Sequence, residues 1–249
     1  MNDERPGNPG GAFPATAWSA IEAARSNDPA ERQRALDRFA ALYWKPVYKY
    51  IRTRWRRSGD DAQDLTQDFF ATLIDRDTLA AFDPARARLR TFVKSCVDAS
   101  VAGADRDARR LKRGGGLAPL SLEYELAEGE LARTGLPAPE RADELFEKEW
   151  TRSLFAAAVS GLRAACAERG RTIDFNIFER YDLNDDQDRQ KTYGELAQEF
   201  GIKVADVTNH LAAARREFRK IVLALLRETT ASEDEYRREA RALLGHAPE

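Results

Sequence analysis

Apolar residues recur at intervals of three and four along most of this chain. The pattern covers residues 28–51, 60–75, 89–113, 143–162 and 193–225. This spacing places apolar side chains on one face of an α-helix and polar side chains on the other. Strand-like alternation is nearly absent, and no internal repeat is visible. The pattern therefore predicts an all-α fold.

Prolines and glycines mark where these helices begin and end. Asp28 followed by Pro29 predicts a helix start, because Asp caps a helix and Pro fits its first turn. Pro46 lies inside that helix and is expected to kink it or divide it. Residues 114–142 carry further prolines and glycines among acidic residues, without a sustained period. We interpret this segment as a linker that is extended or partly ordered on another protein.

These boundaries divide the chain into five predicted parts. They are a disordered tail over 1–12, a helical domain over 13–113, the linker over 114–142, a second helical domain over 143–228 and a C-terminal helical extension over 229–249. The extension is amphipathic, and we expect it to cover the core of the second domain rather than to regulate that domain. The sequence thus predicts two helical domains joined by an extended acidic linker.

Charge is distributed unevenly along the chain. The net charge is −2, although 33% of the residues are charged. Residues 84–113 hold nine basic and three acidic side chains, whereas residues 121–150 are rich in Glu and Asp. A local basic stretch is what contact with a nucleic acid requires, even when the whole chain is nearly neutral.

Other features argue against several classes of protein. Cys96 and Cys166 lie far apart, with neither zinc-ligand spacing nor a disulfide framework. The N-terminal residues lack the apolar core of a signal peptide, and no apolar run reaches the length needed to span a bilayer. We therefore expect a cytoplasmic protein without membrane contact.

The stretch over 60–75 is the most distinctive in the chain. On a helix, Asp61, Asp64, Asp68 and Asp75 fall three, four and seven residues apart and form one acidic stripe. Asp60 is the candidate cap of this helix. Like charges at this spacing repel one another, so the stripe costs stability unless a basic surface meets it. The pattern favours a docking surface; the alternative is a solvated acidic face on a core helix.

The sequence of residues 61–70 resembles a motif in the second conserved region of bacterial RNA polymerase sigma factors of the extracytoplasmic-function (ECF) group. In that family the phrase lies on the helix that docks onto the clamp of the largest polymerase subunit. The resemblance implies that the partners are core polymerase, through its clamp and flap, and promoter DNA, with no metal or other cofactor. It implies the following polymerase contacts: Asp60, Asp61, Asp64, Leu65, Gln67 and Asp68.

Residues 193–202 are typical of the first helix and turn of a helix-turn-helix. Leu196 and Ala197 are expected to face the core, and Gly201 is expected to form the turn. The next helix combines an apolar stripe, on which we place Val204, with a face that carries hydrogen-bonding groups and arginines, as in a helix that enters the major groove. The alternative is an ordinary amphipathic helix with a solvated basic face.

This C-terminal module resembles sigma region four, which binds the promoter −35 element. The sequence of residues 207–212 is similar to that of a subgroup of the family whose members have long inter-domain linkers and a C-terminal helical extension. Ala212 and Ala213 stand where basic residues are frequent in the family, so we expect weaker and less salt-sensitive DNA contact. The implied −35 contacts are Lys203, Thr208, Asn209, Arg215, Arg216 and Arg219.

The basic stretch after Asp83 corresponds to the part of the family that grips the −10 element and traps melted DNA. The recognition loop is expected at 98–100, where Asp98 repels phosphate and the following Ala-Ser offers little stacking surface. Whether this loop recognises bases is left open. The implied −10 contacts are Arg90, Lys94, Arg106, Arg109, Arg110, Lys112 and Arg113.

The same residues permit three alternatives to a sigma factor. Catalysis through a metal on the acidic stripe is disfavoured, because successive turns of one helix rarely converge on one ion and both histidines lie far away in sequence. Two alternatives stay open. One is a helix-turn-helix regulator that does not bind polymerase, and the other is a sigma-like adaptor that binds polymerase but does not recognise promoters. We interpret the chain as an ECF-type sigma factor and not an enzyme; whether an anti-sigma factor or a kinase regulates it is not specified by these residues.

Overall fold

The computed structural model describes residues 28–245 apart from 76–77, 84–85, 109–122, 185–190 and 231. Within these ranges the chain forms helices and no strand, so the all-α prediction is confirmed there. The α-helices are α2 (Pro29–Arg54), α3 (Gly59–Asp75), α4 (Leu89–Ala108), α5 (Tyr124–Thr134), α6 (Ala142–Glu168), α7 (Thr172–Asp182), α8 (Tyr193–Phe200), α9 (Val204–Thr229) and α10 (Glu233–Leu244). Two short 3-10 helices are η1 (Thr78–Ala81) and η2 (Pro139–Arg141).

Helix α2 begins where the sequence predicted and continues further than expected. The Asp28 side chain accepts a hydrogen bond from the Ala30 amide at 2.9 Å, which caps the first turn. The helix runs through Pro46 without being divided. Pro46 removes one intrahelical hydrogen bond, but its neighbours Tyr43 and Val47 are fully buried and hold the helix in place.

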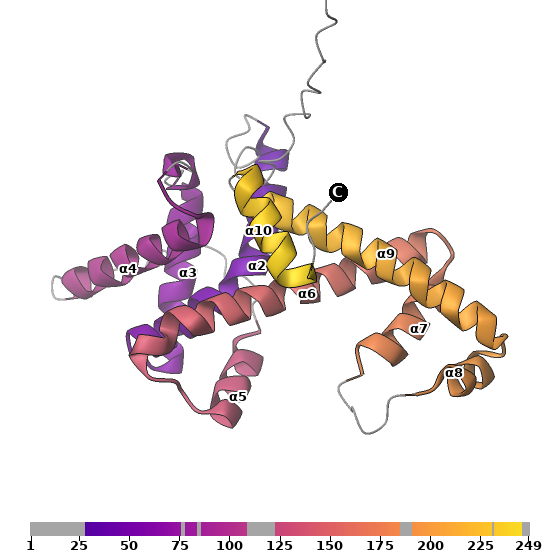
Figure 1. Cartoon of the computed structure of the whole chain (residues 1–249). Coiled ribbons are helices and arrows are strands. Elements are labelled where there is room, and N and C mark those ends of the chain that lie inside the picture. Colours follow the sequence, from indigo (N-terminus) through magenta and orange to yellow (C-terminus); the bar gives the residue numbers. More distant parts are fainter. Residues whose placement is uncertain are drawn as a thin grey trace, which may run out of the picture.

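The largest hydrophobic cluster draws on both halves of the chain. It contains Tyr43 and Ile51 of α2, Trp150 and Leu154 of α6, and Leu226 of α9. Helix α6 crosses the molecule, with α3, α4 and α5 near one end and α7 and α8 near the other (Figure 1). Smaller clusters near the second end join α6 to α7 and α9, and α7 to α8 and α9. The expected division into two separate domains is therefore not confirmed.

The expectation of an extended linker is wrong for residues 124–134, which form α5. Tyr124, Ala127 and Leu131 are buried, and the Tyr124 ring contacts the rings of Trp44 and Tyr48. Acidic side chains of α5 also pair with basic side chains of α2. This helix is short and contains a glycine, so its stability comes from tertiary contacts that a local pattern does not reveal.

The C-terminal extension forms the amphipathic helix that the sequence predicted. Ser232 caps α10, and Tyr236 and Ala240 are buried in the main cluster beside Val222 and Leu226 of α9. The helix thus covers the end of a core that α2, α6 and α9 share. Among the described helices, none is both long and apolar enough to cross a bilayer.

Candidate functional site

Helix α3 presents the acidic stripe to solvent. Asp60, Asp61, Asp64 and Asp68 are all exposed. Among the described residues, no ion pair to these four carboxylates is formed. Burial of part of the side chain, and secondly the charge of Asp64, raise the pKa of Asp68. The stripe is therefore neither sealed inside the fold nor neutralised by the described arginines and lysines.

The other two predicted polymerase contacts, Leu65 and Gln67, are less exposed than the four carboxylates. Leu65 is partly buried against the main cluster, and Gln67 is half-buried. The predicted cap Asp60 is wrong, because the Ser58 hydroxyl accepts a hydrogen bond from the Asp61 amide at 3.1 Å. Asp60 instead extends the stripe by one residue.

Helix α5 lies beside the start of α3. A Cβ added at Gly59 would lie 3.6 Å from the Glu128 side chain. Burial raises the pKa of Tyr124, and the negative charge of Asp64 raises it further. The start of α5 therefore lies close to the acidic stripe, while Glu128 and Glu130 of α5 are paired with basic side chains of α2.

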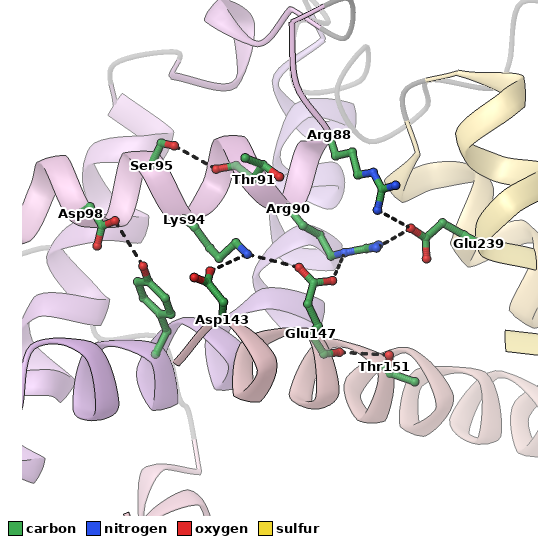
Figure 2. A network of polar contacts seen from close by, with 11 residues as sticks. Arg88, Arg90, Thr91, Lys94, Ser95, Asp98, Asp143, Glu147, Thr151 and Glu239 are labelled. Atoms are coloured by element: carbon green, nitrogen blue, oxygen red, sulfur yellow. Dashed lines mark hydrogen bonds and ion pairs between the residues drawn. The ribbon is translucent and has the colours of Figure 1, made fainter. Parts of the chain in front are cut away.

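The basic face of α4 is occupied by acids of α6 and α10 (Figure 2). The Arg90 guanidinium lies 2.7 Å from Glu147 and 2.6 Å from Glu239, and it stacks 3.9 Å from the centre of the Trp150 ring. Burial lowers the pKa of Arg90, but the carboxylates, Glu147 first, outweigh it, and the net pKa is raised. Arg90 is only 4% exposed, so it supports the structure and does not face DNA in this conformation.

Lys94 is held in the same network. Its ammonium group lies 2.7 Å from Asp143 and 3.4 Å from Glu147, both at the start of α6. In this conformation both cations are therefore bound by partners far away in sequence, and their contact with DNA stays a prediction. Arg106 is exposed, while Arg109, Arg110, Lys112 and Arg113 lie outside the described residues.

The expected −10 recognition loop over 98–100 is wrong, because these residues lie within α4. Asp98 accepts a hydrogen bond from the Trp55 indole at 2.9 Å and another from the Tyr50 hydroxyl at 3.2 Å. An acid that looked unsuitable beside DNA thus satisfies two partly buried donors of the protein itself.

Helices α8 and α9 are joined by a short turn at the positions predicted for a helix-turn-helix. Thr192 and Glu195 make a reciprocal capping box at the start of α8. Leu196 and Ala197 are buried as expected. Gly201 has φ +66, a left-handed conformation that closes the turn and favours glycine. Val204 departs from the predicted apolar stripe, because 52% of it is exposed at the start of α9.

The outer face of α9 contains only part of the predicted −35 set. Thr208, Asn209 and Arg216 are exposed, and Lys203 is exposed just before the helix. Arg215 is also exposed, and it makes two hydrogen bonds with Asp182 of α7, at 2.9 and 2.7 Å. Arg219 is half-buried.

Helix α7 contributes residues that the sequence pattern did not single out. Asp182 holds Arg215, and Asp174, only 3% exposed, lies 2.6 Å from His210 Nδ1. Both contacts join α7 to α9 across more than thirty residues of sequence, so no local spacing identifies them. The network on α4 did have a signal in the sequence. Residues 84–113 are mainly basic and residues 121–150 are mainly acidic, which is the pattern of two segments that can pair.

The described residues contain no group of three or more His, Cys, Asp or Glu side chains placed to hold a metal ion. The candidate site consists of two exposed surfaces, the acidic stripe of α3 and the outer face of α9. Comparison of the chain with models of protein families, with curated proteins and with solved structures finds no match.

Proposed function

We propose that this protein is an ECF-type sigma factor that binds core RNA polymerase through α3 and promoter DNA through α9. The observation that carries the proposal is the exposed acidic stripe of Asp60, Asp61, Asp64 and Asp68 on the helix whose sequence resembles the clamp-binding phrase. Four carboxylates on one face repel one another, and a cationic groove on a partner relieves that repulsion.

The second surface supports the same proposal. Helices α8 and α9 follow one another across the short turn at Gly201, and α9 presents Thr208 and Asn209 near its N-terminal end, with Arg216 following. Hydrogen-bonding groups there suit base edges in the major groove, and the arginine suits phosphate. Such a protein acts in the cytoplasm, with the polymerase clamp and flap and the promoter as its partners.

The stripe is tested by charge reversal. Asp64→Lys is expected to abolish co-elution with core polymerase, because it places a cation against the cationic groove while leaving an exposed position folded. Glu168→Lys is the matched control, since Glu168 is also exposed and lies at the far end of α6. Neither variant should lower the temperature of thermal unfolding, and Asp64→Lys should raise it slightly because it removes a repulsion within the stripe. Normal co-elution of Asp64→Lys would remove the polymerase-binding role.

A sigma-like adaptor is the second candidate, and the state of α4 favours it. Arg90 and Lys94 are paired with acids, and residues 98–100 form helix where a recognition loop was expected. Run-off transcription from a library of promoters separates the candidates. A sigma factor binds polymerase and yields specific transcripts, an adaptor binds polymerase without them, and a helix-turn-helix regulator binds DNA alone.

A further inference from the structure

The first eleven residues of α9 carry no lysine or arginine. The sequence from Val204 to Ala214 is largely apolar, and its polar members are Asp206, Thr208, Asn209 and His210. Its two nearest cations flank it: Lys203 precedes the helix and Arg215 follows. The residues that most often recognise guanine in the major groove, arginine and lysine, are therefore missing from the part of the helix that reads bases.

The side chains of this stretch that face outwards are all uncharged. Val204, Ala205, Thr208, Asn209 and Ala212 are all exposed. Their spacing of three and four places 205, 208, 209 and 212 on one face of α9, with Val204 at its start. This face therefore offers methyl groups, the hydroxyl of Thr208 and a single amide side chain to a partner.

The remaining polar side chains of this stretch point elsewhere. His210 is bound to Asp174 at 2.6 Å on the side of α7, and Asp206 accepts a hydrogen bond from the Lys203 amide at 3.4 Å. Arg215 is held by Asp182 and lies seven residues, about 10 Å, beyond Thr208 along the helix. None of these groups adds a guanine contact to the exposed face.

We propose that α9 recognises A·T base pairs in the major groove, with Asn209 as the residue that selects adenine. An asparagine amide pairs with N6 and N7 of adenine, and apolar groups contact the C5-methyl group of thymine. Asn209 supplies the amide, and Thr208, Ala212 and Val204 supply the methyl contacts. This inference rests on the proposed function, because it assigns a base preference to the helix placed there on DNA.

The experiment is a selection from random duplexes with the full chain at low salt, followed by binding to the enriched sequence. Enrichment of A·T pairs is expected. Replacing thymine by uracil in the bound duplex removes only the methyl group, and replacing adenine by 7-deazaadenine removes only N7. Each change is expected to weaken binding several-fold, and Asn209→Ala is expected to lower the preference for adenine about tenfold.

Two exposed cations on either side of this stretch, Lys203 and Arg216, provide the matched controls. Lys203→Ala and Arg216→Ala are expected to weaken all duplexes alike and to reduce the salt dependence, without changing the preferred bases. An enriched sequence that depends on guanine, or a preference that survives Asn209→Ala, overturns this inference and leaves DNA binding by α9 in place. If no duplex binds at all, the DNA part of the proposed function fails, and the A·T preference fails with it.

Discussion

At the scale of single residues, the buried ion pair between α2 and α6 stands out. Lys49 is 2% exposed and Glu149 is fully buried, and their charged atoms lie 2.9 Å apart. Glu130 of α5 adds a second contact to Lys49 at 2.6 Å. The Arg152 guanidinium, which is exposed to solvent, lies 2.5 Å from the Glu149 carboxylate. Removing one member of such a pair is costly because the other charge stays buried.

Lys49→Met is therefore expected to lower the free energy of unfolding by about 3 kcal/mol, because Glu149 keeps only its contact with the more exposed Arg152. Denaturant titration measures this loss. Lys45→Met is the matched control: Lys45 also binds Glu130 but is 24% exposed, and its replacement is expected to cost less than about 1 kcal/mol. Equal losses for the two variants would show that the buried pair has no special weight.

Residue-level predictions from the sequence held where the partners are local. Leu196, Ala197 and Gly201 occupy the core and turn positions that their spacing indicates. Arg90 and Lys94 could not be placed in the same way, since the acids that bind them lie about fifty or more residues away in the chain. A basic stretch predicts a charge but not whether DNA or the protein itself neutralises that charge.

At the scale of elements, α5 shows how charge fixes a helix that pattern alone does not predict. The Arg52 guanidinium lies 2.6 Å from Glu128, and hydrogen bonds from Arg52 lower the pKa of Glu128 more than burial raises it. For Glu130, burial opposes ionisation, but Lys45 and Lys49 outweigh it and the pKa is lowered. The docking of α5 on α2 thus depends on two ionised carboxylates.

Acidification is expected to weaken this docking. A lowered pKa in the folded state stabilises the fold at pH values above the ordinary value of 4.5, and the contribution is lost as the pH falls through the lowered pKa. Unfolding free energies from pH 7 down to pH 3 should therefore fall more steeply for the natural chain than for Glu128→Gln with Glu130→Gln.

The control for this titration is Glu125→Gln, which removes an exposed acid from the same helix. Its pH profile should follow that of the natural chain. Hydrogen exchange at neutral pH should also be faster over 124–134 in the double variant and unchanged in the control. Parallel profiles for all three proteins would contradict the assigned role of the two carboxylates.

Most other elements follow from the apolar periodicity. The long helices α2, α6 and α9 have many turns over which a buried face repeats, so their existence is visible in the sequence. Helix α5 has only 11 residues, and its neighbouring prolines and glycines resemble those of a linker. The packing of α2 on α6 joins the two expected domains. It depends on contacts between residues far apart in the chain, which the apolar periodicity of each helix does not reveal.

At the scale of the whole molecule, the start of α6 covers the basic face of α4. Under the proposed function, Lys94 contacts single-stranded promoter DNA only after Asp143 and Glu147 release it. Neutralising these two acids is therefore expected to strengthen binding of a single-stranded oligonucleotide. Fluorescence anisotropy at several salt concentrations should show a steeper salt dependence, by about 0.7 for each additional phosphate that the protein neutralises.

The control for this prediction is Glu144→Gln, which removes an acid of the same turn of α6 whose partner is Arg141 instead of a residue of α4. It should leave oligonucleotide binding unchanged. If Asp143→Asn with Glu147→Gln behaves like this control, the acids of α6 do not compete with DNA for α4.

Helix α6 connects the contacts made on α4 with those made under α7 and α9. Its first turns bind α4, and its last turns pack through Leu162 and Cys166 on α7 and α9. Helix α6 is continuous over 27 residues, about 40 Å, between these two ends. Under the proposed function, a shift of its acidic end that is carried along the helix displaces the support under α8 and α9. Occupancy of one surface and affinity at the other are then coupled, in both directions and by the same free energy.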